Sequence, residues 1–229
     1  MSGKLSVIIP VYNERTMIEQ VIANVLSVPV EKEIILVDDG SVDGTRELIQ
    51  ERFSNDGRVR VILHPHNQGK GSAVRTGIGA ATGGRIIIQD ADLEYNPADY
   101  FELLKTMDRS GARVVYGSRF LNKKGVTSGW HRAVNYFLTA LCNGLFASKL
   151  TDMETCYKLF DTNTLKRIKL DSDGFEIEAE LTVKVLKSGE KIVEAPVSYK
   201  GRSYHEGKKI GWKDGVKTMF LLFRYALQK

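Results

Sequence analysis

The stretch that decides the fold is Arg85-Ile86-Ile87-Ile88-Gln89-Asp90-Ala91-Asp92. Its β-branched run predicts a buried strand, and the Asn96-Pro97 pair downstream predicts a turn. Two carboxylates one residue apart therefore stand at the carboxyl end of a strand, where open α/β sheets bind ligands. Hard oxygen ligands of this kind suit Mg²⁺ or Mn²⁺, which also take phosphate oxygens and water. The pattern indicates a metal–diphosphate site, and a solvated acidic loop is the alternative.

Strands and helices alternate on both sides of this stretch. Apolar β-branched runs predict strands at 5–10, 33–37, 59–63, 85–89 and 112–117. Helical spacing of apolar residues predicts helices at 14–26, 45–53, 69–81 and 99–107. This alternation predicts an α/β fold with a mostly parallel, doubly wound sheet covered by helices on both faces. Right-handed crossovers then place the loops after the first, second and fourth strands along one edge.

The second half of the chain has a less regular pattern. It predicts helices at 132–146, 175–186 and 212–227 and a strand at 191–199. We expect one large domain over residues 1–211, divided near residue 117, and a separate terminal helix at 212–229.

Composition narrows the class of protein. The chain has 229 residues, 42% of them hydrophobic, and a net charge of +5, which fits an anionic partner. It lacks a nucleic-acid motif or a platform of alternating aromatic and basic residues, so no nucleic-acid partner is expected. Cys142 and Cys156 make no disulfide framework, and neither a signal peptide nor a membrane-spanning run is expected. We therefore expect a reducing, cytoplasmic compartment.

The loops after the first two strands are polar. They carry Pro10-Val11-Tyr12-Asn13-Glu14 and Asp38-Asp39-Gly40-Ser41. No G-x-G-x-x-G follows the first strand and no G-x-x-x-x-G-K-[ST] occurs, which argues against a dinucleotide fold and a P-loop. A sheet edge lined with carboxylates would instead reach a diphosphate through a metal ion. The alternative for the second loop is an Asx turn with helix caps.

Motifs in this order and spacing resemble family 2 glycosyltransferases of GT-A fold. They are Val7-Ile8-Ile9-Pro10-Val11-Tyr12-Asn13-Glu14, Val37-Asp38-Asp39-Gly40-Ser41, Asn67-Gln68-Gly69-Lys70-Gly71 and Asp90-Ala91-Asp92-Leu93. The sequence most resembles the dolichol-phosphate mannose synthase branch of the polyprenyl-phosphate glycosyltransferases. Supporting motifs are Gly117-Ser118-Arg119, Glu194-Ala195-Pro196-Val197-Ser198-Tyr199 and Gly201-Arg202-Ser203-Tyr204-His205-Glu206-Gly207-Lys208.

The resemblance implies roles for individual residues. The nucleoside-binding set is Pro10, Tyr12, Glu14, Val37 and Asp39. The diphosphate and metal segment is Asp90, Ala91 and Asp92. Family members often have Gln or Ser where this chain has Glu94, whose carboxylate could add a metal ligand or cap the next turn. The basic residues that hold donor phosphates are Arg119, Arg202 and Lys208, and those near the acceptor are Arg132 and Arg202. The implied catalytic residues are Asp92, Arg119 and Arg202.

The implied activity is an inverting transfer that depends on Mg²⁺ or Mn²⁺. A hexose would move from a GDP- or UDP-sugar to a polyprenyl or dolichyl phosphate at the cytoplasmic face of a membrane. Residues 1–117 would form the nucleotide-sugar half and 118–211 the acceptor half. The segment 151–158 departs from the mannose synthase pattern, so the sugar stays open. The terminal helix would either contact the membrane surface peripherally or pack in the core, and a partner could supply an anchor.

Two alternative functions remain at this stage. The same fold could transfer a sugar to a glycan hydroxyl, which would need a base from among Glu176, Glu178 and Asp152. Those carboxylates could equally be solvated or capping groups. The chain could also be a non-catalytic nucleotide-sugar or membrane-binding module.

The sequence also contains a basic segment at 200–209. This segment could be either a lid over phosphates or a solvated loop.

Overall fold

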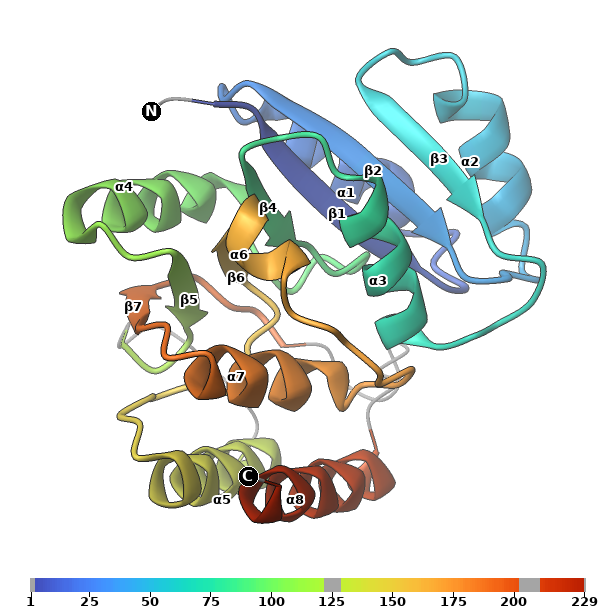
Figure 1. Ribbon diagram of the computed structural model, residues 1–229. Helices are drawn as coiled ribbons and strands as arrows, with labels where there is room; N and C mark the ends of the chain where they lie inside the picture. The colour runs from blue at the N-terminus through green and yellow to red at the C-terminus, as the bar shows by residue number, and fades with distance from the viewer. Residues whose placement is uncertain (1–2, 122–128, 202–210, 229) are drawn as a thin grey trace.

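The computed structural model describes residues 3–121, 129–201 and 211–228 (Figure 1). Its strands are β1 (Leu5–Val11), β2 (Lys32–Asp38), β3 (Val59–Leu63), β4 (Arg85–Ile88), β5 (Val114–Ser118), β6 (Lys158–Asp161) and β7 (Ile192–Pro196). Its helices are α1 (Ile18–Ser27), α2 (Thr45–Phe53), α3 (Lys70–Ala80), α4 (Tyr100–Ser110), α5 (Gly129–Phe146), α6 (Thr162–Lys166), α7 (Ile177–Lys187) and α8 (Trp212–Leu227). A short helical turn, η1 (Pro97–Asp99), leads into α4.

The strands form one sheet in the order β3-β2-β1-β4-β6-β5-β7. β1 pairs in parallel with both β2 and β4, and β2 pairs in parallel with β3. The loops that follow β1, β2 and β4 therefore leave the sheet at the same edge, as predicted. Helices lie on both sides of these strands, with α3 in front and α1 behind (Figure 1). The predicted α/β fold with a mostly parallel sheet is confirmed.

The sequence did not predict strand β6. It lies between β4 and β5 and runs antiparallel to both. Its four residues, Lys158–Asp161, are too few for periodicity to separate a strand from other structure. Because β6 and β7 both come from the second half of the chain, the two halves share one sheet. The predicted division near residue 117 stays a prediction.

Several predicted elements have different ends in the structure, among them α1 and β7. α1 begins at Ile18 instead of residue 14, and β7 ends at Pro196 instead of residue 199. β7 is the edge strand beside β5, and proline is tolerated there although it has no amide hydrogen to donate. The chain continues past Pro196 and forms an isolated bridge between Tyr199 and Tyr95.

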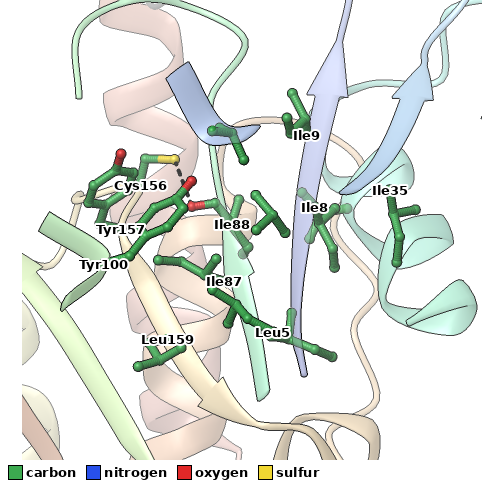
Figure 2. Close-up of a cluster of buried hydrophobic side chains, with 14 of the residues drawn as sticks. Leu5, Ile8, Ile9, Ile35, Ile87, Ile88, Tyr100, Cys156, Tyr157 and Leu159 are labelled. Atoms are coloured by element: carbon green, nitrogen blue, oxygen red, sulfur yellow. Dashed lines mark hydrogen bonds between the residues drawn. The ribbon is translucent and has the colours of Figure 1, made fainter. Parts of the chain in front are cut away.

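The strand that leads into the 90–92 turn ends in a buried apolar cluster (Figure 2). Ile8, Ile87 and Ile88 are fully buried, as expected of strands covered on both faces. Each such side chain contributes about 1.5–3 kcal/mol by leaving water. α3 packs so closely on β1 that a Cβ atom at Gly77 would lie 2.3 Å from Ile8 Cγ2. The sheet is therefore a tightly packed base for the loops at its edge.

Helices α5, α7 and α8 enclose a second apolar cluster. Its buried members are Leu138, Cys142, Met153, Ala179, Val183, Leu221, Leu222 and Tyr225. α5 and α8 lie side by side beneath α7 (Figure 1). One face of the terminal helix is thus packed in a core, while Phe220, Phe223 and Leu227 on the same helix are exposed. Within the described ranges, none of the helices combines the length and apolar character needed to cross a bilayer.

Candidate active site

The loops after β1 and β2 are joined at the predicted nucleoside site. Pro10 pairs with Val37 across the two strands. The amide of Asn13 donates to the Ser41 hydroxyl at 2.9 Å, and the adjacent Glu14 is buried. Asn13 has a φ of 50°, a conformation that asparagine tolerates better than most residues. These loops and strand ends carry the predicted nucleoside-binding residues Pro10, Tyr12, Glu14, Val37 and Asp39.

Asp39 ties the second loop to the start of α3. One carboxylate oxygen, Oδ1, accepts from the Gln68 amide at 2.9 Å and lies 2.7 Å from His64 Nδ1. The other, Oδ2, accepts from the Gly69 amide at 2.7 Å. The other ring nitrogen of His64 lies 2.9 Å from the Thr76 hydroxyl. Asp39 therefore orders the 67–69 turn, and its predicted contact with the base or ribose stays a prediction.

A row of alternating charges runs inward from the 90–92 turn. Lys70 Nζ lies 2.7 Å from Asp90 Oδ1 and 2.9 Å from Glu178 Oε1. The other oxygen of Glu178 accepts from Lys158, a fully buried lysine on β6. These residues come from α3, the loop after β4, α7 and β6, so the fold assembles the row from four separate elements. Its two positive and two negative side chains balance one another.

The neighbouring charges set the protonation of Asp90. Burial by itself would raise the pKa of Asp90, but the charge and hydrogen bond of Lys70, together with Cys156 and Lys158, lower it below the ordinary value. Two carboxylates likewise overcome burial at Lys70 and hold the pKa of its ammonium well above the ordinary value. Asp90 is therefore a carboxylate, and Lys70 is charged, at neutral pH.

Hydrogen bonds join the turn after β4 to the chain beyond β7. Asp92 Oδ1 accepts from the Glu94 amide at 3.1 Å. The carboxylate of Glu94 accepts from the Tyr199 hydroxyl at 2.7 Å, and its carbonyl accepts from the Lys200 amide at 2.8 Å. The residues that would position a metal are thus linked to the segment just before Arg202.

The donor set of the 90–94 turn fits a magnesium-type ion. Asp90 and Asp92 flank Ala91, which is buried in the core. In the part of the chain that the structure describes, no group of three or more His, Cys, Asp or Glu side chains is arranged to hold a metal. Mg²⁺ commonly binds one or two carboxylates and completes its shell with waters and substrate phosphates. Asp90 and Asp92 would hold such an ion together with a diphosphate, and the contribution of Glu94 stays a prediction.

Arg119 is held in place by Asp152. Its Nε and Nη2 donate to the two carboxylate oxygens, each at 2.7 Å, and its backbone amide adds a third bond at 3.0 Å. Asn135 donates to the same carboxylate at 2.8 Å. The Arg119 guanidinium also lies 5.0 Å from the centroid of the Tyr199 ring. Both carboxylate oxygens of Asp152 therefore accept hydrogen bonds, from Arg119 and Asn135.

Arg132 and Arg119 both lie against the ring of Phe120. The guanidinium carbons of both arginines are 5.9 Å from the centroid of the Phe120 ring. Arg132 stands on α5 and is exposed, so the side chain predicted near the acceptor can reach solvent beside Arg119. The predicted phosphate ligands Arg202 and Lys208 lie outside the described residues.

Sequence reasoning missed several charged residues of this site. The sequence marks Lys70 only through a family motif, and it gives no signal of a role for Lys158 or Glu154. One carboxylate oxygen of Glu154, Oε1, is buried and has no hydrogen-bond partner among the described residues. Burial raises the pKa of Glu154 to about 7 although Lys158 opposes it. Glu154 stands in an irregular stretch before β6, where no periodic signal marks a buried side.

Comparison with known proteins gives the family. The family model described as "Glycosyl transferase family 2" matches residues 6–169, more than half of the chain. The chain belongs to glycosyl transferase family 2. The matched range contains the 7–14, 37–41, 67–71 and 90–93 motifs. This family 2 chain is a glycosyltransferase, which sets aside a non-catalytic module.

Two curated proteins are similar to this family 2 enzyme over most of its length. A dolichol-phosphate mannosyltransferase of Pyrococcus furiosus is 31% identical over 99% of this chain, which spans 64% of that protein. A polyprenol monophosphomannose synthase of Mycolicibacterium smegmatis is 29% identical over 90% of this chain and 80% of its own length. The chain thus spans a little under two thirds of the Pyrococcus protein.

A solved structure shares the fold. It is the glucosyl-3-phosphoglycerate synthase of Mycobacterium tuberculosis, in complex with Mn²⁺, UDP and phosphoglyceric acid. The TM-score is 0.74 at 18% identity, over 98% of this chain and 78% of that one. The GT-A fold that the motifs implied is confirmed for this family 2 glycosyltransferase.

Proposed function

We propose that this glycosyltransferase moves a hexose from a nucleoside-diphosphate sugar to a polyprenyl or dolichyl phosphate. The observation that carries the proposal is the likeness to a dolichol-phosphate mannosyltransferase and a polyprenol monophosphomannose synthase over 99% and 90% of the chain. The donor would be a GDP- or UDP-hexose, seated on the loops after β1 and β2. The acceptor would be an anionic lipid phosphate beside Arg119 and Arg132.

The carboxylates at the end of β4 support a donor bound through a metal. The fold relative from Mycobacterium tuberculosis was solved with Mn²⁺ and UDP together. In this chain Asp90 and Asp92 would hold Mg²⁺ or Mn²⁺. When bound, the ion would neutralise negative charge that develops on the departing nucleoside diphosphate. The Lys70 side chain lies against Asp90 and the Glu94 backbone amide donates to Asp92, so the protein would fix these two carboxylates and, through them, the diphosphate.

A phosphate acceptor needs little help from a base. A phosphomonoester has a second pKa of about 6, so it is already an anion at neutral pH and can attack the anomeric carbon directly. A single direct displacement inverts that carbon. Catalysis then depends on holding the two phosphates in line and offsetting their charge. Arg119 and Arg132 flank the Phe120 ring and can supply positive charge there. Arg202 is the further arginine expected at the acceptor.

The acids that could serve a hydroxyl acceptor are mostly engaged. Asp152 is bound by Arg119 and Asn135, and Glu178 lies between Lys70 and Lys158. Both carboxylates are therefore already paired with basic or amide side chains. This arrangement favours a phosphate over a hydroxyl acceptor.

Among the three acids predicted from the sequence, Glu176 keeps a glycan hydroxyl as a second candidate acceptor. Glu176 Oε2 is buried and has no hydrogen-bond partner among the described residues. Glu176→Gln separates the two candidates. A phosphate acceptor predicts that transfer persists, whereas a hydroxyl acceptor that uses this base predicts a loss of about 10²–10⁴-fold.

Exposed aromatic side chains support contact with a membrane surface. We call Tyr136, Phe137, Phe220 and Phe223 the aromatic face; they lie on α5 and α8 and are all exposed. Exposed lysines such as Lys217 on α8 complement an anionic leaflet. We propose peripheral binding at the cytoplasmic face of a membrane, either directly or through an anchoring partner.

The direct test is a transfer assay. The protein is incubated with Mg²⁺ or Mn²⁺, a panel of GDP- and UDP-hexoses and a polyprenyl phosphate, and lipid products are separated by chromatography. We expect one nucleotide sugar to give a lipid-phosphate sugar. Transfer to an oligosaccharide and not to the lipid would contradict the proposal and support the hydroxyl acceptor.

A further inference from the structure

Lys70 has a role that the family motif by itself does not assign. It is the first residue of α3 and its side chain is only 12% exposed. It bridges Asp90 at the end of β4 to Glu178 on α7, at 2.7 and 2.9 Å. A third neighbour is the Phe175 ring, whose centroid lies 5.8 Å from the ammonium. The only cation that touches Asp90 among the described residues is thus a lysine built into the fold.

The backbone around Lys70 fixes its position. A Cβ atom at Gly69 would lie 2.2 Å from the Asp173 carbonyl oxygen, and one at Gly71 would lie 2.2 Å from that of Ser172. The Gly71 amide donates to the Asp173 carbonyl at 2.7 Å. Glycine on both sides of Lys70 therefore lets the start of α3 press against the loop that leads into α7. This contact places the ammonium between the two carboxylates.

The ammonium competes with any ion that approaches Asp90. Its nitrogen lies 2.7 Å from Oδ1, so a metal ion bound at that oxygen would stand a few ångströms from a like charge, and such charges repel each other strongly in a partly buried site. A nucleoside diphosphate changes that balance because its phosphates bring negative charge and accept hydrogen bonds from an ammonium. The ion and the diphosphate should then bind more tightly together than either does alone.

We propose that Lys70 is a positioning residue that keeps Asp90 from holding a divalent cation by itself, so that the cation and the nucleoside diphosphate bind as a pair. This inference rests on the proposed function. It makes the strength of metal binding depend on the donor, which is a thermodynamic coupling between two ligands. Lys70→Met removes the charge while keeping most of the side-chain length.

The test measures how tightly the full chain binds Mn²⁺. The electron paramagnetic resonance signal of free Mn²⁺ reports how much of the ion is unbound. Mn²⁺ is titrated alone and with saturating GDP or UDP. We expect Lys70→Met to bind Mn²⁺ alone at least tenfold more tightly than the unmodified chain. The factor by which nucleotide tightens Mn²⁺ binding should fall at least fivefold. Lys70→Arg should behave like the unmodified chain, and Lys70→Gln replaces the Met variant if that variant does not fold.

Two controls make the result specific. Lys105→Met removes an exposed lysine of α4 that lies 3.8 Å from Glu102, and it should leave Mn²⁺ binding unchanged. In the Asp90→Asn background, Lys70→Met should add no further tightening, which isolates the pair as a double-mutant cycle. Mn²⁺ binding within twofold of the unmodified chain in Lys70→Met overturns this inference alone. No Mn²⁺ binding by any variant, even with either nucleotide, overturns the metal role in the proposed function and this inference with it.

Discussion

Arg119 and Asp152 form a buried ion pair with two parallel hydrogen bonds of 2.7 Å. Burial would raise the pKa of Asp152, but Arg119 and Asn135 together lower it below the ordinary value. The pair joins the end of β5 to the irregular segment before β6, and Asn135 ties it to α5. An arginine predicted to hold a phosphate is therefore oriented by the second half of the chain, so the two halves of the site are mechanically linked.

Asp152→Asn should destabilise the protein strongly. It would leave the Arg119 guanidinium buried beside a neutral amide, and removing one partner of a buried pair costs about 3–5 kcal/mol. The free energy of unfolding in urea measures this loss. Transfer activity should fall as well, because the guanidinium loses its orientation.

Asp56→Asn is the matched control. Asp56 also binds an arginine with two hydrogen bonds, at 3.0 and 2.8 Å, but Arg58 is 63% exposed. An exposed pair contributes about 0–1 kcal/mol, so this variant should unfold nearly as the unmodified chain does. Equal losses in the two variants would show that burial of the Arg119 pair is unimportant.

Gly71→Ala should destabilise the start of α3. The added methyl group would lie 2.2 Å from the Ser172 carbonyl oxygen, a backbone atom that cannot move alone. Overpacking of this kind costs about 1–3 kcal/mol. Gly79→Ala in the same helix is the control, since nothing lies within 4 Å of its Cβ position and alanine favours a helix by up to about 1 kcal/mol. Thermal unfolding of both variants measures the difference, and a stable Gly71→Ala would contradict the close contact.

Much of the fold follows from local sequence. The Ile86–Ile88 run marks a strand buried on both faces, and the carboxylates that follow it stand where a parallel sheet presents its ligands. β6 was not predictable because four residues carry too little periodic signal, and its antiparallel place depends on distant neighbours. The position of β6 in the sheet depends on the strands it pairs with, not on the hydrophobic pattern of its own four residues.

The candidate site also contains residues that the sequence predicts and residues that it does not. Asp90 and Asp92 could be found because both lie in one turn of the sequence. The partners of Asp90 could not, since Lys70 and Glu178 come from helices far apart in the chain and meet only in the folded structure. Asp152 was predicted as a base candidate, but the structure places it against Arg119, a pairing that no spacing rule could reveal.

Asp92→Asn should abolish most of the transfer to lipid phosphate. Losing one group that stabilises charge in the reaction costs about 10²–10³-fold in rate. Chelation of divalent ions with EDTA should abolish transfer by the unmodified enzyme, and added Mn²⁺ should restore that activity. Asp56→Asn serves again as the control and should keep its activity. Normal turnover of Asp92→Asn under chelation would refute the metal role of this turn.

Replacing Phe220 and Phe223 with serine should weaken binding to vesicles. Both belong to the aromatic face and are 67% and 45% exposed, so the fold should lose little stability. Apolar side chains inserted at a bilayer surface contribute through buried area, in addition to attraction between lysines and anionic lipids. Co-sedimentation with phosphatidylglycerol vesicles measures the change, and we expect binding to fall at least fivefold. Val42→Ser is the control, because Val42 is 84% exposed on the loop after β2. Equal binding by both variants would remove the aromatic face from the proposal.

Glu154→Gln should change how stability depends on pH. Burial raises the pKa of Glu154 from 4.5 to about 7, so in the folded state the carboxyl keeps its proton above the pH at which the unfolded chain loses it. Stability due to this group therefore falls as pH rises from about 5 to 7 and then levels off. Glutamine stays neutral throughout, so the variant should match the unmodified chain near pH 5 and exceed it by about 1–3 kcal/mol at pH 8. Urea unfolding at both pH values measures the difference.

Glu51→Gln, an exposed change on α2, is the control and should keep the pH dependence of the unmodified chain.

The Glu154→Gln variant also bears on catalysis. A carboxyl group with a pKa near 7 that sat in the path of a hydroxyl acceptor would serve as a base, and its loss would lower transfer above pH 7. With a phosphate acceptor we expect Glu154→Gln to keep transfer at pH 8 while gaining stability. A variant that lost transfer at pH 8 without losing stability would favour the hydroxyl acceptor.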